Sequence, residues 1–538
     1  MLIDEQQEPT VENLARRVHH VLIQGLGEGS KKVEQYVPVF VCNMDRHSDC
    51  SSGGLVFIAL KSRTSKRKKY PPVVGAWMVV RDLVLFKDKV PHRTFYQWAK
   101  CHGPVYSVRT GLTSAVVVLN SAKAARQAMT EHHSSITAKN LTTALKVLSL
   151  HQTMVALSHY GRDHRLMKKL MVSHLLGTTP QRNNAFMRKE MVQKLIASMY
   201  VELKEACNDT VNMSKIILGH LFPFALNQVI GRTVEPLYVE ELGSKVVSLQ
   251  DMYNLIVGDP ANAALEINWR DFIPIVNRWL PNKKLQKMLN DVTRRRSALV
   301  RALIHQEKDL LSSGKEPKGY LDMLLKEGEI LSERQLETAI WEPVIESTTT
   351  SHVAMVWAFF NLAKHPHTQE RLYKELEQVC GKKAVEEKDL GKLPYLKGIF
   401  YETVRRHSPL PLVPLRIVHE DVEIDGYHVP AGWEILINIW GANNYEGEWK
   451  NSEEWKSERQ LEFPMEEDIY RTMVFGAGNR LCAGWTQAVT IASLIIGRIV
   501  QNFELKMPTG HEEDYDTIIN TGTHRLRPLI SILTPRNL

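Results

Sequence analysis

Apolar residues recur at helical spacing over much of the chain, most densely between about residue 122 and residue 380. Such a period indicates amphipathic and buried helices. Short runs rich in β-branched and aromatic residues show a strand-like pattern instead, and two of them flank Gly111 as in a hairpin. The strand-like runs cover residues 106–110, 115–119, 423–429 and 435–439. The pattern therefore predicts a mainly α-helical protein with small β-sheets near both ends.

The longest predicted helix runs from Ser332 to about Lys364. Ser332 and Gln335 form a capping box at its start, and a His-Pro pair directly after Lys364 marks its end. A helix of about 32 residues spans roughly 48 Å, which favours a place in the centre of a large domain. A second helix is predicted from Pro394 to His407, where a Ser-Pro pair follows.

The composition of the 538-residue chain is that of a globular protein, with 43% apolar and 24% charged residues. A chain of this length can bury a cavity large enough for a cofactor. Its six cysteines are scattered and form no C-x-x-C pair. This arrangement argues against a zinc site and suits a reducing compartment.

The N-terminal part shows neither a signal peptide nor a full membrane span. Residues 1–54 form an extension without a basic start and apolar core. The apolar run Leu55–Leu60 is far shorter than the roughly 20 residues of a span, and we interpret it as the stub of an anchor. Part of the net charge of +8 lies in a basic run at 61–69, which is either a solvated linker or a membrane-proximal patch. Nucleic acid is not an expected partner, because no aromatic residues interleave this run. With the proline pair that follows, residues 55–75 are predicted to precede one large domain, 76–538.

The candidate chemistry is concentrated in a glycine-punctuated loop, Phe475–Gly484, ahead of a long apolar helix predicted from Ala483 to about Val500. Cys482 stands in this loop, two residues after Arg480. Backbone N–H groups and a helix N-terminus lower the pKa of a thiol, and glycines let the backbone approach a flat macrocycle closely. The loop therefore suits a thiolate that ligates a haem iron. The alternative is a buried free cysteine, which is what most lone cysteines are.

The same loop resembles the signature of the cytochrome P-450 superfamily, the haem-thiolate monooxygenases, and the resemblance extends from about Pro71 to the end of the chain. It implies the mainly α cytochrome P-450 fold in a single large domain, with haem b as cofactor. It also implies that electrons come from NADPH through a partner NADPH-cytochrome reductase. Cys482 becomes the axial ligand of the iron, Phe475 covers the sulfur, and Gly478 allows the close approach of the loop. The side chains implied for the haem propionates are Arg480, Arg416, His164 and Lys168. A buried network beside the haem is implied for Glu402, Arg405 and Arg459.

The predicted central helix departs from the P-450 pattern over the haem. Thr350 fits the threonine that hydrogen-bonds bound oxygen, but Thr349 stands where the superfamily has an acid. A hydroxyl relays a proton without supplying one as a carboxyl group does. Glu346, one turn earlier, is a candidate substitute proton donor, with a purely structural hydrogen bond as the alternative. The residues expected at the substrate pocket, or else in core packing, are Val344, Ile345, Thr348, Leu412, Val413 and Ile519.

Several segments, such as 106–111, 154–158 and 413–421, resemble plant ent-kaurene oxidases in particular. This closer resemblance implies that one methyl group of an apolar diterpene is oxidised with O2 to an alcohol, an aldehyde and a carboxylic acid. The implied context is gibberellin or related diterpenoid biosynthesis. It also implies a membrane surface as partner, at the cytosolic face of the endoplasmic reticulum or the plastid outer envelope.

Three other hypotheses stay open at the level of sequence. The threonine at position 349 is compatible with a haem-thiolate isomerase or dehydratase that needs no reductase. A diverged haem-binding relic would incorporate haem without turnover. A helical interaction protein with an incidental cysteine would bind no haem at all.

Overall fold

The computed structural model describes residues 68–79, 82, 90–110, 114–205, 209–264, 266, 268, 271, 279–328, 330–462, 468–508, 518–519, 524–525 and 528–536. Residues from Lys66 onward make up one compact unit. The predicted N-terminal extension, the Leu55–Leu60 run and most of the basic run lie outside the described residues. Among the described residues, no helix combines the length and the apolar character needed to cross a bilayer.

Helices dominate the described chain, as the apolar periodicity predicts. They are α2 (Ala76–Val79), α3 (Pro91–His102), α4 (Ala122–Thr130), α5 (Thr143–Leu148), α6 (Arg162–Met171), α7 (Thr178–Asn183), α8 (Ala185–Glu205), α9 (Met213–Ile230), α10 (Leu249–Tyr253), α11 (Asp259–Ala263), α13 (Lys283–Ser312), α14 (Tyr320–Lys326), α15 (Glu333–Lys364), α16 (Pro366–Cys380), α17 (Pro394–Arg406), α18 (Ile439–Asn443), α19 (Arg459–Glu462) and α20 (Trp485–Asn502). Shorter 3₁₀ and π turns include η2 (Val172–Leu176), η3 (Glu240–Leu242), η4 (Asn254–Gly258), η6 (Glu387–Lys392) and η7 (Gly478–Arg480).

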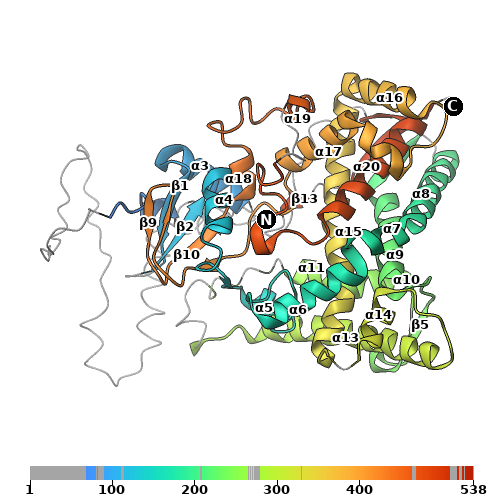
Figure 1. Ribbon diagram of the computed structural model, residues 1–538, viewed down its shortest axis with the longest axis horizontal. Helices are drawn as coiled ribbons and strands as arrows, with labels where there is room; N and C mark the ends of the chain where they lie inside the picture. The colour runs from blue at the N-terminus through green and yellow to red at the C-terminus, as the bar shows by residue number, and fades with distance from the viewer. Residues whose placement is uncertain are drawn as a thin grey trace, which may run out of the picture. The chain divides into compact units, whose positions relative to one another are not determined.

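The strands are short and form small sheets. They are β1 (Val105–Arg109), β2 (Ala115–Leu119), β3 (Ala138–Lys139), β4 (Thr210–Asn212), β5 (Leu237–Val239), β6 (Lys245–Val247), β7 (Arg416–Ile417), β8 (Val422–Ile424), β9 (Tyr427–Val429), β10 (Glu434–Ile437), β11 (Phe503–Lys506), β12 (Ile518–Ile519), β13 (His524–Arg525) and β14 (Ile530–Pro535). The largest sheet has the order β1-β2-β10-β7-β3. Figure 1 shows β1, β2, β9 and β10 gathered with α3, α4 and α18 on one side of the molecule, away from the main group of helices.

Two hairpins that the sequence predicts are confirmed. β1 and β2 pair antiparallel, with Val105 opposite Leu119. β8 and β9 pair antiparallel around Asp425 and Gly426, which have positive φ angles of 49° and 77°. Two consecutive positive φ values define the turn that matches the right-handed twist of paired strands.

The segment after the basic run lies along the edge of the largest sheet. The N–H of Ser107 donates to the carbonyl of Pro72 at 2.7 Å, and the N–H of Val74 donates to the carbonyl of Ser107 at 2.9 Å. The proline pair therefore leads directly into the sheet and is fixed to β1.

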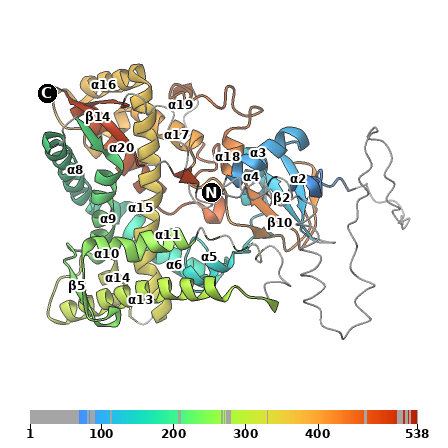
Figure 2. The ribbon, with the colours of Figure 1, turned by 180° about the vertical axis from the view of Figure 1, so that it is seen from behind.

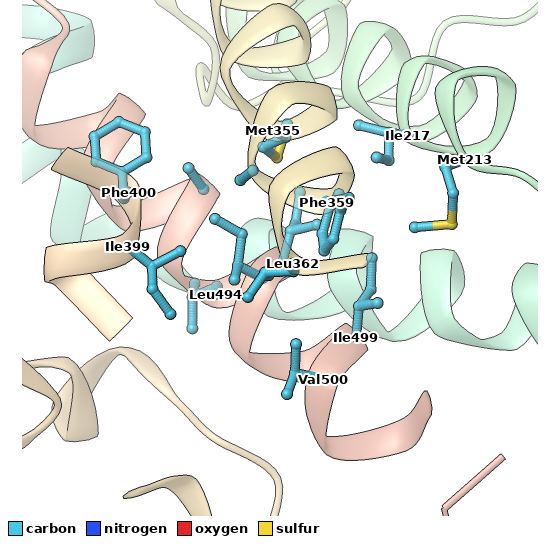
Figure 3. Packing of buried hydrophobic residues seen from close by; sticks show 14 of the residues in the cluster. Met213, Ile217, Met355, Phe359, Leu362, Ile399, Phe400, Leu494, Ile499 and Val500 are labelled. Atoms are coloured by element: carbon cyan, nitrogen blue, oxygen red, sulfur yellow. The ribbon is translucent and has the colours of Figure 1, made fainter. Parts of the chain in front are cut away.

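The predicted central helix is confirmed as α15, with Ser332 as N-cap and both hydrogen bonds of the Ser332–Gln335 capping box present. It packs against α9, α17 and α20, and both ribbon views show it running through the helical part of the molecule (Figures 1 and 2). Apolar side chains from these four helices interlock in the main core (Figure 3). The residues labelled there are Met213, Ile217, Met355, Phe359, Leu362, Ile399, Phe400, Leu494, Ile499 and Val500. A core this tightly filled holds α15 rigidly.

Two predicted boundaries are wrong by two residues. The strand expected to run to Ile439 ends at Ile437, because the Asn438 side chain accepts a hydrogen bond from Gly441 and begins α18. The helix expected from Ala483 begins at Trp485, with Gly484 as its N-cap residue. The first shift follows from a side-chain cap that apolar periodicity does not reveal, whereas Gly484 makes no side-chain capping bond at the second.

Candidate active site

Cys482 lies between η7 and the N-terminus of α20. Its backbone N–H donates to the carbonyl of Phe475 at 2.8 Å and closes the loop. Gly476 and Gly478 have φ values of 72° and 56°, in the left-handed region where glycine carries no steric cost. A Cβ on Gly478 would meet the carbonyl oxygen of Met129 at 2.7 Å. This glycine therefore allows the loop to lie directly against α4.

The thiol of Cys482 faces an internal space. The side chain is accessible to water, although protein atoms surround it on nearly every side. Burial raises the pKa of the thiol to about 11, and the nearby Glu346 adds to this effect, while the Gly484 N–H and Lys168 oppose it. A thiolate at neutral pH therefore requires a further positive partner, and a metal ion is the usual one.

Lys168 holds the backbone of the cysteine loop. Its ammonium group donates to the carbonyls of Asn479 at 3.0 Å and Leu481 at 2.9 Å. The sequence places Lys168 at a haem propionate, whereas the structure engages two of its three N–H donors with the loop itself. Lys168 thus sets the position of Cys482 and brings a positive charge toward it.

We expect Gly478→Ala to displace the loop and to reduce haem incorporation several-fold. The variant combines an unfavourable φ with a collision against α4, which together cost about 2–4 kcal/mol. Haem content per protein and the thermal unfolding midpoint measure the effect. Gly314→Ala is the matched control, because Gly314 has a φ of 95° and no atom within 4 Å of the added Cβ. Equal losses in both variants would contradict the role of the α4 contact.

Arg480, His164 and Arg416 come together on the other side of the loop. Arg480 donates from Nη1 to Nδ1 of His164 at 3.1 Å and from Nη2 to the carbonyl of Thr137 at 3.2 Å. Ser158 Oγ lies 3.0 Å from the same Nδ1. Because Nδ1 accepts, the proton of neutral His164 sits on Nε2. Burial, reinforced by Arg480, lowers the pKa of His164 to about 4, which keeps the ring neutral.

Several buried donors of this group have no acceptor within the described part of the chain. They include Nε2 of His164 and Nε of Arg416. Burial and the charge of Arg480 lower the pKa of Arg416 to about 10, so this guanidinium still carries its charge at neutral pH. Arg416 and Arg480 line a small cavity of about 10 Å³ together with Tyr160 and Asn479. Of the two unpaired donors, that of Arg416 lies at this cavity, and each indicates a missing acceptor. The charges of Arg416 and Arg480 favour an anion as that acceptor.

Three successive threonines, at positions 348 to 350, give α15 a run of side-chain hydroxyl groups. Thr350 Oγ1 donates to the carbonyl of Glu346 at 2.8 Å. The buried hydroxyls of Thr348 and Thr349 have no hydrogen-bond partner among the described residues. Buried hydroxyls without a partner are uncommon in folded proteins, which sets this turn of α15 apart.

The donor set fits haem. A loop cysteine facing an internal space can ligate the iron, and the glycine-lined loop leaves room for a flat ring. The unpaired donors of His164 and Arg416, with Arg480 beside them, can bind the propionates.

Glu402, Arg405 and Arg459 form one buried network, as the sequence predicts they would. Both carboxylate oxygens of Glu402 accept from Arg405 at 2.9 Å, and Arg459 Nε lies 3.3 Å from the same carboxylate. Arg405 also donates to the carbonyls of Ser452 and Glu454 at 3.0 Å. The network ties α17 to the segment that leads to the cysteine loop.

The predicted pocket residues are placed in different ways. Val344 is fully buried in a core cluster with α9 and α13, and Thr348 is fully buried as well. Ile345, Leu412 and Val413 are only partly buried, and Val413 lies beside the core of the largest sheet. Ile519 lies in β12, and its side chain is outside the described part of the structure.

Glu342 and Lys139 are two further residues at this site that the sequence analysis does not single out. Glu342 lies one turn before Glu346 on α15, and Lys139 lies on β3 opposite Arg416 on β7. Two acids four residues apart in a mostly apolar helix are a sequence signal for the first. No local pattern indicates the second, because strand pairing alone brings it to the site.

Comparison with known proteins agrees with this geometry. The Cytochrome P450 family model matches residues 71–528. The chain is 41% identical to ent-kaurene oxidase 2 of Oryza sativa subsp. japonica, over 88% of this chain and 92% of the relative. It is 38% identical to ent-kaurene oxidase of Salvia miltiorrhiza, over 90% of this chain and 94% of the relative. It is 35% identical to ent-sandaracopimaradiene 3-hydroxylase of Oryza sativa subsp. japonica, over 87% of this chain and 91% of the relative.

The fold agrees as well. A zebra fish cytochrome P450 solved with progesterone superposes with a TM-score of 0.68 at 21% identity, over 83% of this chain and 99% of that chain. Fold, cysteine loop and sequence similarity point to the same assignment. The chain belongs to the cytochrome P450 family, and it is a haem-thiolate monooxygenase that takes electrons from NADPH through a reductase.

Proposed function

We propose that this monooxygenase is an ent-kaurene oxidase, which converts one methyl group of a tetracyclic diterpene to an alcohol, an aldehyde and a carboxylic acid. The observation that carries the proposal is the similarity to two ent-kaurene oxidases, at 41% and 38% identity, over nearly the full length of both relatives. The pathway would be gibberellin or related diterpenoid biosynthesis. The relative named as an ent-sandaracopimaradiene 3-hydroxylase makes another diterpene the second candidate substrate.

Three of the residues predicted for the substrate pocket suit an apolar substrate. Ile345 on α15 and Leu412 and Val413 ahead of β7 offer aliphatic surface that is only partly covered by other protein atoms. Apolar surface of this kind binds a hydrocarbon because burial removes both from water. Cys482, Arg480, Arg416 and His164 would hold the haem, which supplies the activation of O2 when bound. Thr350 would orient water and protons from the turn of α15 that it shares with Glu346.

The direct test is turnover by the full-length enzyme with NADPH, a plant reductase and ent-kaurene. We expect ent-kaurene to give the alcohol, the aldehyde and the acid in sequence, by gas chromatography with mass detection. ent-Sandaracopimaradiene serves as the competing substrate. Product formation without reductase would contradict monooxygenation, and selective turnover of the competing diterpene would replace the proposed substrate.

Membrane association belongs to the same proposal. An apolar substrate and the resemblance to membrane-bound oxidases support a site at the endoplasmic reticulum or the plastid outer envelope. Fractionation of the expressed full-length protein tests this, and recovery in the supernatant alone would contradict it.

We expect Thr350→Ala to lower the amount of product formed per NADPH by about tenfold or more, because ordered proton delivery contributes at least that much. Electrons should appear as hydrogen peroxide instead, while haem content stays normal. Thr350→Ser is the matched control, since it keeps the hydroxyl that donates to Glu346. Unchanged coupling in the alanine variant would refute the assigned role of Thr350.

A further inference from the structure

Glu342 and Glu346 lie one turn apart on the same face of α15. Glu342 is fully buried, and its two carboxyl oxygens accept the backbone N–H groups of Val155 at 3.0 Å and Ala156 at 2.9 Å. Glu346, one turn along the same face, is partly buried. Two carboxyl groups held this close in the interior repel each other when both are ionised, which favours a proton on one of the two.

We propose that Glu342 and Glu346 share one buried proton, and that this pair supplies the proton for which the family pattern has an acid at the position of Thr349. Glu346 is the donor in this pair. Glu342 is a positioning residue, which the Val155 and Ala156 N–H groups fix in place. The inference deepens the proposed function, on whose oxygen chemistry it rests.

The surroundings of Glu342 and Glu346 explain why one proton stays on the pair near neutral pH. Burial raises the pKa of Glu346 to about 7, with Lys139 acting in the opposite direction. Burial, followed by the charge of Glu346, raises the pKa of Glu342 well above its usual value. Two neighbouring carboxyls in a dry site cannot both ionise without a large electrostatic cost. The pair is therefore a store of one acidic proton near neutral pH.

Other titratable groups face the pair from neighbouring elements. Lys139 on β3 donates to the carbonyl of Ala156, and burial with the charges of Arg416 and Arg480 lowers the pKa of Lys139 well below its usual value. The charge of Glu342 contributes to a raised pKa of Tyr320 on α14, and that of Glu346 contributes to the raised pKa of Cys482. When the proton leaves Glu346, the pair becomes doubly negative with Lys139 beside it. A proton from water then restores it, so no covalent bond changes.

Infrared spectroscopy of the full-length haem-loaded enzyme tests for the shared proton. We expect a carbonyl band of a protonated carboxyl group at neutral pH that changes in position or intensity in both Glu346→Gln and Glu342→Gln. It should be absent from the double variant, because burial alone still raises the pKa of the acid that remains in each single variant. Glu337→Gln is the matched control, because Glu337 lies on the same helix but faces Arg301 at 3.1 Å instead of a second carboxyl. No such band in the wild type, an unchanged band in both single variants, or a band that persists in the double variant would overturn the proposal.

The pH dependence of stability gives a second readout that is independent of turnover. A carboxyl whose pKa is higher in the folded state binds more protons there, so stability falls as pH rises. For Glu346 this decline should extend from pH 4.5, the ordinary pKa of the carboxyl group, to about pH 7, its pKa in the folded protein. The urea midpoint of Glu346→Gln should rise relative to the wild type across this window and run parallel above it. Lys139→Met should extend the upper end of this pH window, because Lys139 lowers the pKa of both acids in the folded state. Parallel profiles at all pH values would contradict a shared proton.

The amount of product formed per NADPH then tests whether the proton of the pair is used in oxygen activation. We expect Glu346→Gln and Glu342→Gln to form about tenfold less product per NADPH while haem content and substrate binding stay normal. Normal coupling in both variants would overturn the supply role. If the wild type oxidises no diterpene, the proposed substrate fails, whereas the infrared and stability measurements still decide whether the pair holds a proton.

Discussion

Replacing Cys482 by alanine is expected to remove the strongly red-shifted Soret band of the carbon monoxide complex of the reduced enzyme, together with all monooxygenase turnover. Cys482 is an accessible free cysteine just ahead of α20, and thiolate ligation is what favours O–O cleavage in this class of enzyme. The difference spectrum of the dithionite-reduced protein measures the effect. Cys482→Ser is a second variant that keeps the size of the side chain and loses the sulfur.

Cys101→Ala is the matched control, because Cys101 is an exposed free cysteine on α3. We expect this variant to keep the wild-type spectrum and turnover. A red-shifted band that survives in Cys482→Ala would refute the assignment of the axial ligand. A blue-shifted band in the wild type would show a protonated thiol, and the relic hypothesis would then take the place of the proposed function.

Arg405→Ala is expected to destabilise the fold by about 3–5 kcal/mol, because it leaves a carboxylate buried with too few partners. Glu402 has no exposed surface, and Arg405 contacts both of its oxygens at 2.9 Å. Arg459 at 3.3 Å, the N–H of Lys456 at 3.1 Å and the side-chain amide of Gln460 at 3.4 Å would stay in contact with the carboxylate, and none of them makes the paired contact that Arg405 makes. The urea midpoint and the yield of haem-loaded protein should both fall sharply.

An exposed ion pair provides the control for this effect. Lys194 and Glu190 lie 2.8 Å apart on α8, with 67% and 57% of their side chains exposed. Lys194→Ala should cost less than about 1 kcal/mol, since solvent screens exposed pairs. The loss of stability in Arg405→Lys should lie between these two losses, because an ammonium group keeps the charge but cannot make the bidentate contact. A loss in Arg405→Ala no larger than that in Lys194→Ala would refute the structural role of the network.

The features that could be predicted from the sequence are those that depend on neighbours in the chain. The capping box at Ser332 and the turn at Asp425 and Gly426 are local hydrogen-bonding and φ preferences, and both are present. The loop around Cys482 is also contiguous, so its glycines and its cysteine could be recognised together. Several boundaries lie one or two residues from the predicted ones, and at Asn438 a side-chain cap accounts for the shift.

The features that could not be predicted depend on docking between distant segments. Lys168 lies one turn after His164 on α6, and the sequence assigns both to the propionates. The docking of α6 on the cysteine loop instead directs Lys168 to the carbonyls of Asn479 and Leu481. Periodicity states which face of a helix a residue occupies, but not which partner that face meets.

The sequence by itself determined the family and the central helix of this protein and singled out Cys482 as the candidate axial ligand, because each depends on a continuous stretch of residues with a local physical cause. Only the tertiary structure decided that Glu342 meets the N–H groups of Val155 and Ala156, and that Lys139 lies beside the acid pair. Strand pairing and helix packing bring these segments together. Their burial then turns ordinary acids into a proton store, because the cost of a charge depends on what surrounds it in space.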